Sequence, residues 1–115
     1  MTQARIGKEA KIDPKDTPKY LWKSGHMVEW DKATVHISRI SWTSVSAVFE
    51  GIRAYWNDEL NKLFVFELEP HLKRLYQSMK IMRMTPPCSK QELGQGIIDL
   101  LRANEYKCDC YVQPL

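Results

Sequence analysis

The sequence predicts an α+β domain in which a small antiparallel sheet is covered on one side by two helices. Short runs of β-branched and aromatic residues are separated by turn residues, a pattern typical of antiparallel hairpins. Two longer segments, about 69–84 and 89–104, carry apolar residues at helical spacing. A chain of 115 residues has room for one such domain with one core.

The composition argues against a membrane-spanning, a secreted or a nucleic-acid-binding protein. The hydrophobic content of 43 % is typical of a soluble protein, and no apolar run approaches the ~18 residues that a membrane span needs. No apolar stretch follows the N-terminus, so we expect no secretory signal. The net charge is +3, and five of the seventeen cationic residues lie within positions 1–19. The rest of the chain is close to neutral, so neither a membrane nor a nucleic acid is an expected partner.

The three cysteines, Cys88, Cys108 and Cys110, cannot all pair within the chain, and no CxxC motif is present. This usage favours reduced thiols and therefore a cytoplasmic location.

Residues 1–19 have no sustained apolar period and are predicted to form a flexible basic arm. The alternative is an arm that crosses to a partner subunit. The structured domain is expected from 20 to 115. It begins with strands at 20–23 and 27–30, joined by a turn at Ser24-Gly25, and a third short strand is expected at 34–37.

The middle of the chain predicts a short helix, a strand and a returning strand. Val45, Val48 and Phe49 share one helical face within 44–50. Gly51 suits a left-handed residue that ends this helix. A strand at 52–56 follows, with Arg53 and Tyr55 on the face opposite Ile52. After a turn at 57–61, a largely buried strand is expected at 62–68.

Two amphipathic helices are predicted next. The first runs over 69–84, with Pro70 in its first turn, and Arg74 lies opposite its apolar stripe. That stripe comprises Leu72, Leu75, Tyr76, Met79 and Met82. The second opens on a capping box, Ser89 with Glu92, and Asn104 is its expected C-cap. Gly94 and Gly96 either weaken this helix or allow close packing on it.

Residues 110–115 read as the start of a further strand, which suggests that the sequence is part of something longer.

Without a family in view, the residues predict no catalytic constellation. GxGxxG, P-loop, HExxH and GxSxG motifs are absent. The three histidines are far apart in sequence, and His36 is expected to make a hydrogen bond rather than bind a metal. Glu50 and Glu69 are conceivable as an acid–base pair, although nothing sets their separation.

Three motifs carry a resemblance to a known family. They are SVxxVFEGIRAY at 44–55, LxPHLKRLxxSMKIMRM at 68–84 and YVxPL at 111–115. In this order and spacing the chain resembles the N-terminal domain of class IV pyridoxal-phosphate aminotransferases, which include the branched-chain amino acid aminotransferases. The resemblance implies a two-domain homodimer that moves an amino group between a hydrophobic amino acid and 2-oxoglutarate, with pyridoxal 5'-phosphate in the cleft between the domains.

Site residues follow from the matching motif positions. Arg74 in HLKRL matches the family arginine that binds the cofactor phosphate, and a guanidinium suits that anion. We expect Arg74 to point away from its own core toward a cleft. Phe49 in VFEG matches the apolar wall of the substrate pocket, or alternatively is a core residue. Tyr111 matches another substrate-pocket residue, and Arg53 is expected to be structural.

The chain also departs from the family pattern. Branched-chain members carry tyrosine and glycine where Ser44 and Val45 stand here, and often arginine in place of Gln113. These changes keep open a D-amino acid or amine aminotransferase, or a lyase acting on a chorismate derivative.

The resemblance places the Schiff-base lysine, and the glutamate expected to pair with the pyridine nitrogen, in a second domain that this sequence does not include. The chain alone is therefore expected to be inactive. A different reading is a standalone, non-catalytic interaction module.

Overall fold

The computed structural model describes residues 17–39 and 47–115. Most of the predicted basic arm, together with Ser44 and Val45, lies outside the described residues. The described part contains five strands and two α-helices, and two single 3-10 turns at Trp30–Lys32 and Ile37–Arg39. None of its helices is both long enough and apolar enough to cross a membrane.

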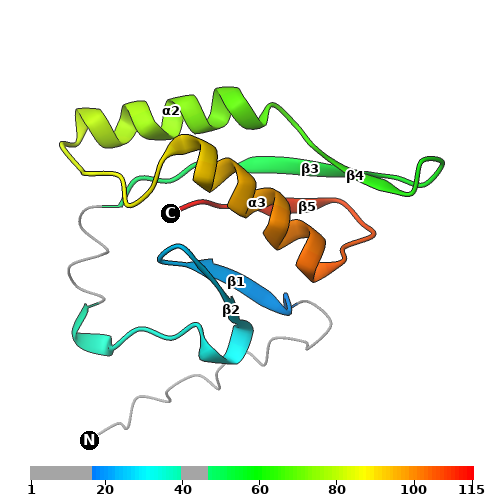
Figure 1. The fold of residues 1–115 in the computed structure, drawn as a ribbon, viewed down its shortest axis with the longest axis horizontal. Coiled ribbons are helices and arrows are strands. Elements are labelled where there is room, and N and C mark those ends of the chain that lie inside the picture. The colour runs from blue at the N-terminus through cyan, green and yellow to red at the C-terminus, as the bar shows by residue number, and fades with distance from the viewer. Residues whose placement is uncertain (1–16, 40–46) are drawn as a thin grey trace, which may run out of the picture.

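A three-stranded antiparallel sheet forms the centre of the fold (Figure 1). Strand β3 (Ile52–Asn57) lies between β4 (Lys62–Val65) and β5 (Cys110–Val112). Ala54 pairs with Val65 on one side and with Cys110 on the other. The predicted hairpin is therefore confirmed, although its second strand, expected at 62–68, ends at Val65. The strand expected at the end of the chain is also present.

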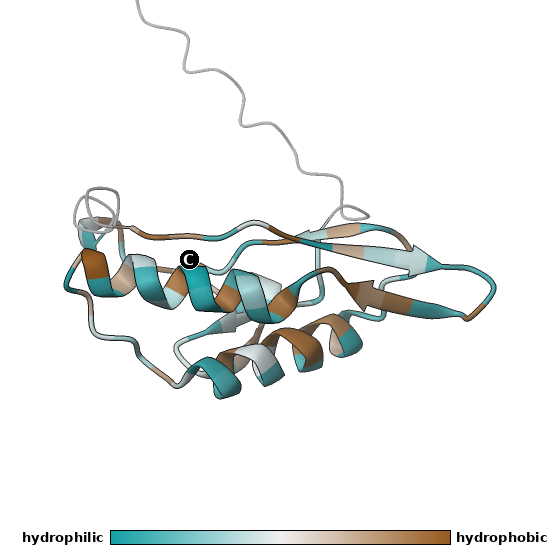
Figure 2. Ribbon diagram, turned by 90° about the horizontal axis from the view of Figure 1, so that it is seen from above, coloured by the Kyte–Doolittle hydropathy of each residue, from teal (hydrophilic) through white to brown (hydrophobic). Residues whose placement is uncertain are grey.

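Helices α2 (Leu68–Ile81) and α3 (Lys90–Asn104) pack against one face of this sheet. Both show alternating hydrophobic and hydrophilic bands along their length (Figure 2). The buried cluster joins the sheet to both helices through Ile52, Ala54, Leu72, Ile97 and Leu101. The predicted arrangement, a small antiparallel sheet with two helices on one side, is confirmed.

The opposite face of the sheet is uncovered within the described residues. It presents aromatic side chains, because successive residues of a strand point to opposite faces. Tyr55, Phe64, Phe66 and Tyr111 are all exposed, and the rings of Tyr55 and Phe66 meet edge to face with centroids 6.2 Å apart. Strand β4 was expected to be largely buried, but only its inner residues, Leu63 and Val65, are partly covered.

A second, two-stranded sheet is formed by β1 (Tyr20–Lys23) and β2 (His26–Glu29). Its turn places Ser24 at φ 52° and Gly25 at φ 85°, which suits the twist of a two-residue hairpin. The hairpin is attached to α3 through Asn104. The Tyr20 amide donates to the Asn104 side-chain oxygen at 2.9 Å, and the Asn104 amide donates back to the Tyr20 carbonyl at 3.1 Å. Asn104 thus connects two elements, and the C-cap is Glu105.

The glycines of α3 allow close packing, which was one of the two roles predicted for them. A methyl carbon on Gly94 would lie 3.0 Å from a Leu72 methyl carbon on α2. A methyl carbon on Gly96 would lie 2.9 Å from the ring of Trp22 on β1. Side chains at these positions would therefore separate the layers.

The capping box that opens α3 is confirmed. The Glu92 amide donates to the Ser89 hydroxyl at 3.2 Å, and the Ser89 amide donates to the Glu92 carboxylate at 2.7 Å. Helix α2 ends three residues earlier than expected, at Ile81. The chain turns there because Arg83 takes a left-handed conformation (φ 56°) and the Met84 amide donates to the Met79 carbonyl at 2.8 Å.

Two predicted elements are wrong in the described region. The strand expected at 34–37 is absent, and a 3-10 turn occupies Ile37–Arg39. A helix was expected at 44–50, but residues 47–50, the part of this segment that the structure describes, are not helical. There the Glu50 amide donates to the Pro114 carbonyl at 3.1 Å, which continues the β3–β5 register. Gly51 accordingly has no left-handed φ and ends no helix.

Candidate functional site

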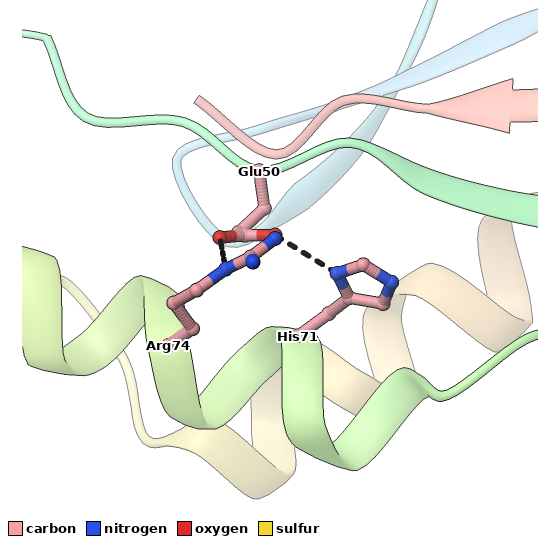
Figure 3. A network of polar contacts seen from close by, with 3 residues as sticks. All are labelled: Glu50, His71 and Arg74. Atoms are coloured by element: carbon pink, nitrogen blue, oxygen red, sulfur yellow. Dashed lines mark hydrogen bonds and ion pairs between the residues drawn. The ribbon is translucent and has the colours of Figure 1, made fainter.

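A cluster of three side chains connects α2 to the segment before β3 (Figure 3). His71 and Arg74 lie three residues apart on α2, a spacing that places them on one side of the helix. Both point toward Glu50. The Glu50 carboxylate accepts from Arg74 Nε at 2.5 Å, from Arg74 Nη2 at 2.7 Å and from His71 Nδ1 at 2.9 Å.

The Glu50 side chain is buried, whereas that of Arg74 is exposed. The Glu50 side chain is 6 % exposed, whereas Arg74 is 67 % exposed. Hydrogen bonds from Arg74 are the main reason why the pKa of Glu50 is lowered to about 2, and His71 lowers it further, while burial acts in the opposite direction. The same carboxylate raises the pKa of Arg74. The cluster therefore contains a buried anion and an exposed cation at neutral pH.

Arg74 matches its prediction only in part. Its side chain points outward, away from buried Leu72 and Leu75, as expected. However, the guanidinium is already engaged by Glu50, a pairing that the sequence did not predict. A cavity of about 490 Å³ lies between the first hairpin, α2, α3 and residues 111–115, and Arg74 does not line it, although its neighbour Leu75 does.

Phe49 and Tyr111 lie on the other side of the sheet from the cluster. Residues 50, 52 and 54 point to the helix side of the sheet. Because successive side chains of an extended chain alternate between the two faces, Phe49 points to the opposite side. Phe49 is 59 % exposed, which contradicts the alternative reading of a core residue. Tyr111 is 57 % exposed and lies directly opposite Arg53. The structure therefore places both predicted substrate residues on the outer face and Arg74 on the helix side.

Gly51 permits the position of Tyr111. A methyl carbon on Gly51 would lie 2.1 Å from the Tyr111 hydroxyl oxygen, so the ring can rest there only on a glycine. Tyr111 also lines the cavity of about 490 Å³, together with Gln113. The glycine of the VFEG motif is thus explained by close approach rather than by a helix end.

The hypothetical acid–base pair of Glu50 and Glu69 is not supported. Glu50 is bound to Arg74 and His71, whereas Glu69 forms an ion pair with Lys90. Likewise, His36 contacts the Ser38 hydroxyl at 2.7 Å. No group of three or more candidate ligands for a metal ion occurs among residues 17–39 and 47–115.

The sequence reasoning considered Glu50 only as a partner of Glu69 and missed its pairing with Arg74 and His71. Its partners are 21 and 24 positions away, so no local pattern indicates the contact. The one available signal was its place between Phe49 and Gly51 in a motif already singled out for other reasons.

Comparison with known proteins identifies the family of this chain. Residues 47–115 match the family described as amino-transferase class IV. Because this match covers more than half of the chain, the protein belongs to the class IV aminotransferases. The chain is also 36 % identical over 96 residues to the branched-chain-amino-acid aminotransferase of Escherichia coli K12, and 33 % identical to a probable one of Aquifex aeolicus.

Solved structures agree with this assignment. The branched-chain amino acid aminotransferase of Thermobaculum terrenum, determined in its PLP form, superimposes with a TM-score of 0.80 at 47 % identity. That of Thermoproteus uzoniensis with norvaline gives 0.74 at 37 % identity. Both similarities cover 84 % of this chain, but only 31–32 % of the other chain. This chain likewise spans about 30 % of the length of the curated relatives.

Proposed function

We propose that this chain is the N-terminal part, with its ordered domain at 20–115, of a homodimeric, cytoplasmic, pyridoxal-phosphate-dependent aminotransferase. The complete enzyme would move an amino group between a branched-chain or other hydrophobic amino acid and 2-oxoglutarate. The observation that carries the proposal is the similarity to the Thermobaculum terrenum enzyme in its PLP form over 84 % of this chain. Coverage of only 31 % of that enzyme supports the view that further residues are required.

Arg74 is the proposed ligand of the cofactor phosphate, and its donors fit that group. Glu50 occupies the Nε–Nη2 edge of the guanidinium, while both Nη1 hydrogens and one Nη2 hydrogen have no protein partner in the described part of the chain. These donors form a second edge of the kind that binds phosphate oxygens. When bound, pyridoxal phosphate supplies the electron sink for transamination.

Inactivity of the 115-residue chain is part of the proposal. A lysine that binds the cofactor covalently needs surroundings that lower the pKa of its amine. No lysine in the described ranges is buried, and the least exposed, Lys90, pairs with Glu69. The Schiff-base lysine is expected in a second domain.

Phe49 and Tyr111 are the proposed contacts of the substrate side chain. Their exposure supports this role, because an aromatic surface on the sheet is available to another domain or subunit. Gln113, where related sequences often have arginine, is exposed and favours a second candidate: an enzyme of the same superfamily acting on D-amino acids, on amines or on a chorismate derivative.

The test compares this chain with the complete product of its gene. Each is mixed with pyridoxal 5'-phosphate, and visible absorbance of bound cofactor and amino transfer to 2-oxoglutarate are measured. We expect both signals for the complete protein, with L-leucine as a better donor than D-alanine, and neither for the chain of 115 residues. A gene product that ends at Leu115 would refute the aminotransferase and favour a non-catalytic interaction module.

A further inference from the structure

Glu50 is an unusual residue in this surface cluster. Among the described residues it is the one charged side chain that is buried. By contrast, the carboxylates of Glu29, Glu69 and Glu105, which pair with lysines, are 60–71 % exposed. Burying a carboxylate is unfavourable unless charged donors compensate for the lost water. A buried glutamate at this position therefore needs a reason beyond a surface ion pair.

The backbone holds Glu50 firmly. Its amide donates to the Pro114 carbonyl at 3.1 Å, in register with β3 and β5. Its carboxylate also accepts from His71 Nδ1 at 2.9 Å. Because both attachments are independent of Arg74, Glu50 offers the guanidinium a fixed anchor at the sheet.

The anchor determines the direction of the guanidinium. A long, exposed arginine normally samples many rotamers, and a ligand that binds it must restrict them. Here Nε and Nη2 bind the two carboxylate oxygens side by side, which fixes the plane of the guanidinium. The opposite edge is left to face solvent in one orientation. The carboxylate partly neutralises the positive charge, so the benefit to an anion is orientation rather than net attraction.

We infer that Glu50 is a positioning residue, which holds the Arg74 guanidinium with its free edge presented to a phosphate group. The inference rests on the proposed function, in which that phosphate belongs to the cofactor. The depressed pKa of Glu50, about 2, agrees with it, because the carboxylate then keeps its charge at neutral pH. Neither Phe49 nor Tyr111 takes part, since both lie on the outer face.

The test uses the complete gene product, freed of cofactor and labelled with ¹⁵N. The Nε–H signal of Arg74, assigned by its loss in Arg74→Lys, reports how well the guanidinium is held. Its exchange rate with water is measured first. Inorganic phosphate is then added to about 50 mM, with chloride used to keep the ionic strength constant.

For Glu50→Gln we expect exchange at least about tenfold faster, because a neutral amide accepts only one of the two hydrogen bonds. The dissociation constant for phosphate should rise about tenfold, equivalent to about 1.4 kcal/mol. Glu69→Gln is the matched control, since it makes the same change on α2 at the pair with Lys90, and both values should stay within about twofold of wild type. Glu50→Asp, which retains the charge, should give intermediate values and replaces Glu50→Gln if that variant does not fold.

The outcomes separate the two proposals. If Glu50→Gln leaves Arg74 protected and phosphate binding unchanged, the positioning role is wrong while the cofactor role of Arg74 stands. If Arg74 is protected in the wild type but does not respond to phosphate, the cofactor role itself is wrong.

Discussion

Protonation of Glu50 should weaken the folded chain in acid, by an amount that the structure bounds. The pKa of this carboxyl falls from an ordinary 4.5 to about 2 on folding, chiefly through the hydrogen bonds from Arg74. One pKa unit corresponds to about 1.4 kcal/mol, which sets an upper limit of about 3 kcal/mol. Arg74 is 67 % exposed, so solvent screening lowers this to roughly 1–2 kcal/mol.

The sign follows from which state binds the proton more tightly. The folded state binds it less tightly, so the contribution is complete above the unfolded pKa of 4.5 and is lost as the pH falls toward about 2. Urea unfolding, followed by tryptophan fluorescence at low micromolar protein, measures the free energy of unfolding at pH 7 and pH 2. The stability difference between wild type and Glu50→Gln should shrink by roughly 1–2 kcal/mol between these pH values.

Glu69→Gln is the control, because that carboxylate is 70 % exposed and its pair with Lys90 should contribute little. A difference between wild type and Glu50→Gln that is the same at pH 7 and pH 2 would refute the reasoning, since it would mean that Glu50 titrates alike in the folded and unfolded states.

Three further predictions concern packing, capping and the exposed face. Gly51→Ala should displace the Tyr111 ring, because the new methyl would lie 2.1 Å from its hydroxyl oxygen. Since this ring is 57 % exposed and is free to move away, the free energy of unfolding in urea titrations should fall by less than about 1 kcal/mol, and a loss of about 3 kcal/mol would contradict the reasoning. Ser89→Ala should cost about 1 kcal/mol by the same assay through loss of the α3 cap, and an unchanged midpoint would argue against it. The aromatic outer face should make the chain self-associate, and Phe64→Glu, at a residue 49 % exposed, should reduce the mass found by light scattering. A monomeric wild type would exclude this.

Local patterns predicted the parts of the fold whose partners lie nearby in sequence. The hairpin of β3 and β4 follows from alternating side chains around a short turn. The α3 cap follows from Ser89 and Glu92, three residues apart. Close packing at Gly94 and Gly96 was one of two readings, and only the position of Leu72 and Trp22 decided between them.

The errors arose where distant contacts override a local preference. Val48 and Phe49 have helical spacing, but the Glu50 amide is bound to Pro114, 64 positions away, and continues a sheet register. Alternation at 34–37 was insufficient for a strand, because no strand among residues 17–39 and 47–115 pairs with it. A β-pattern indicates only that a residue suits a sheet.

The candidate site was predictable to a similar degree. The outward direction of Arg74 follows from helical periodicity, and its role follows from the family resemblance. The pairing with Glu50 and His71 depends on how α2 lies beside the segment before β3. Tertiary packing sets that arrangement, and the spacing of residues along one helix carries no information about it.

The most direct test of the account is the affinity of the complete gene product for pyridoxal 5'-phosphate after Arg74→Gln. Loss of charge-assisted hydrogen bonds worth about 1.5–3 kcal/mol should raise the dissociation constant roughly ten- to a hundredfold. Arg102→Gln, at an exposed arginine of α3, should leave it unchanged. Equal affinity of Arg74→Gln and wild type would contradict the claim that this guanidinium holds the cofactor.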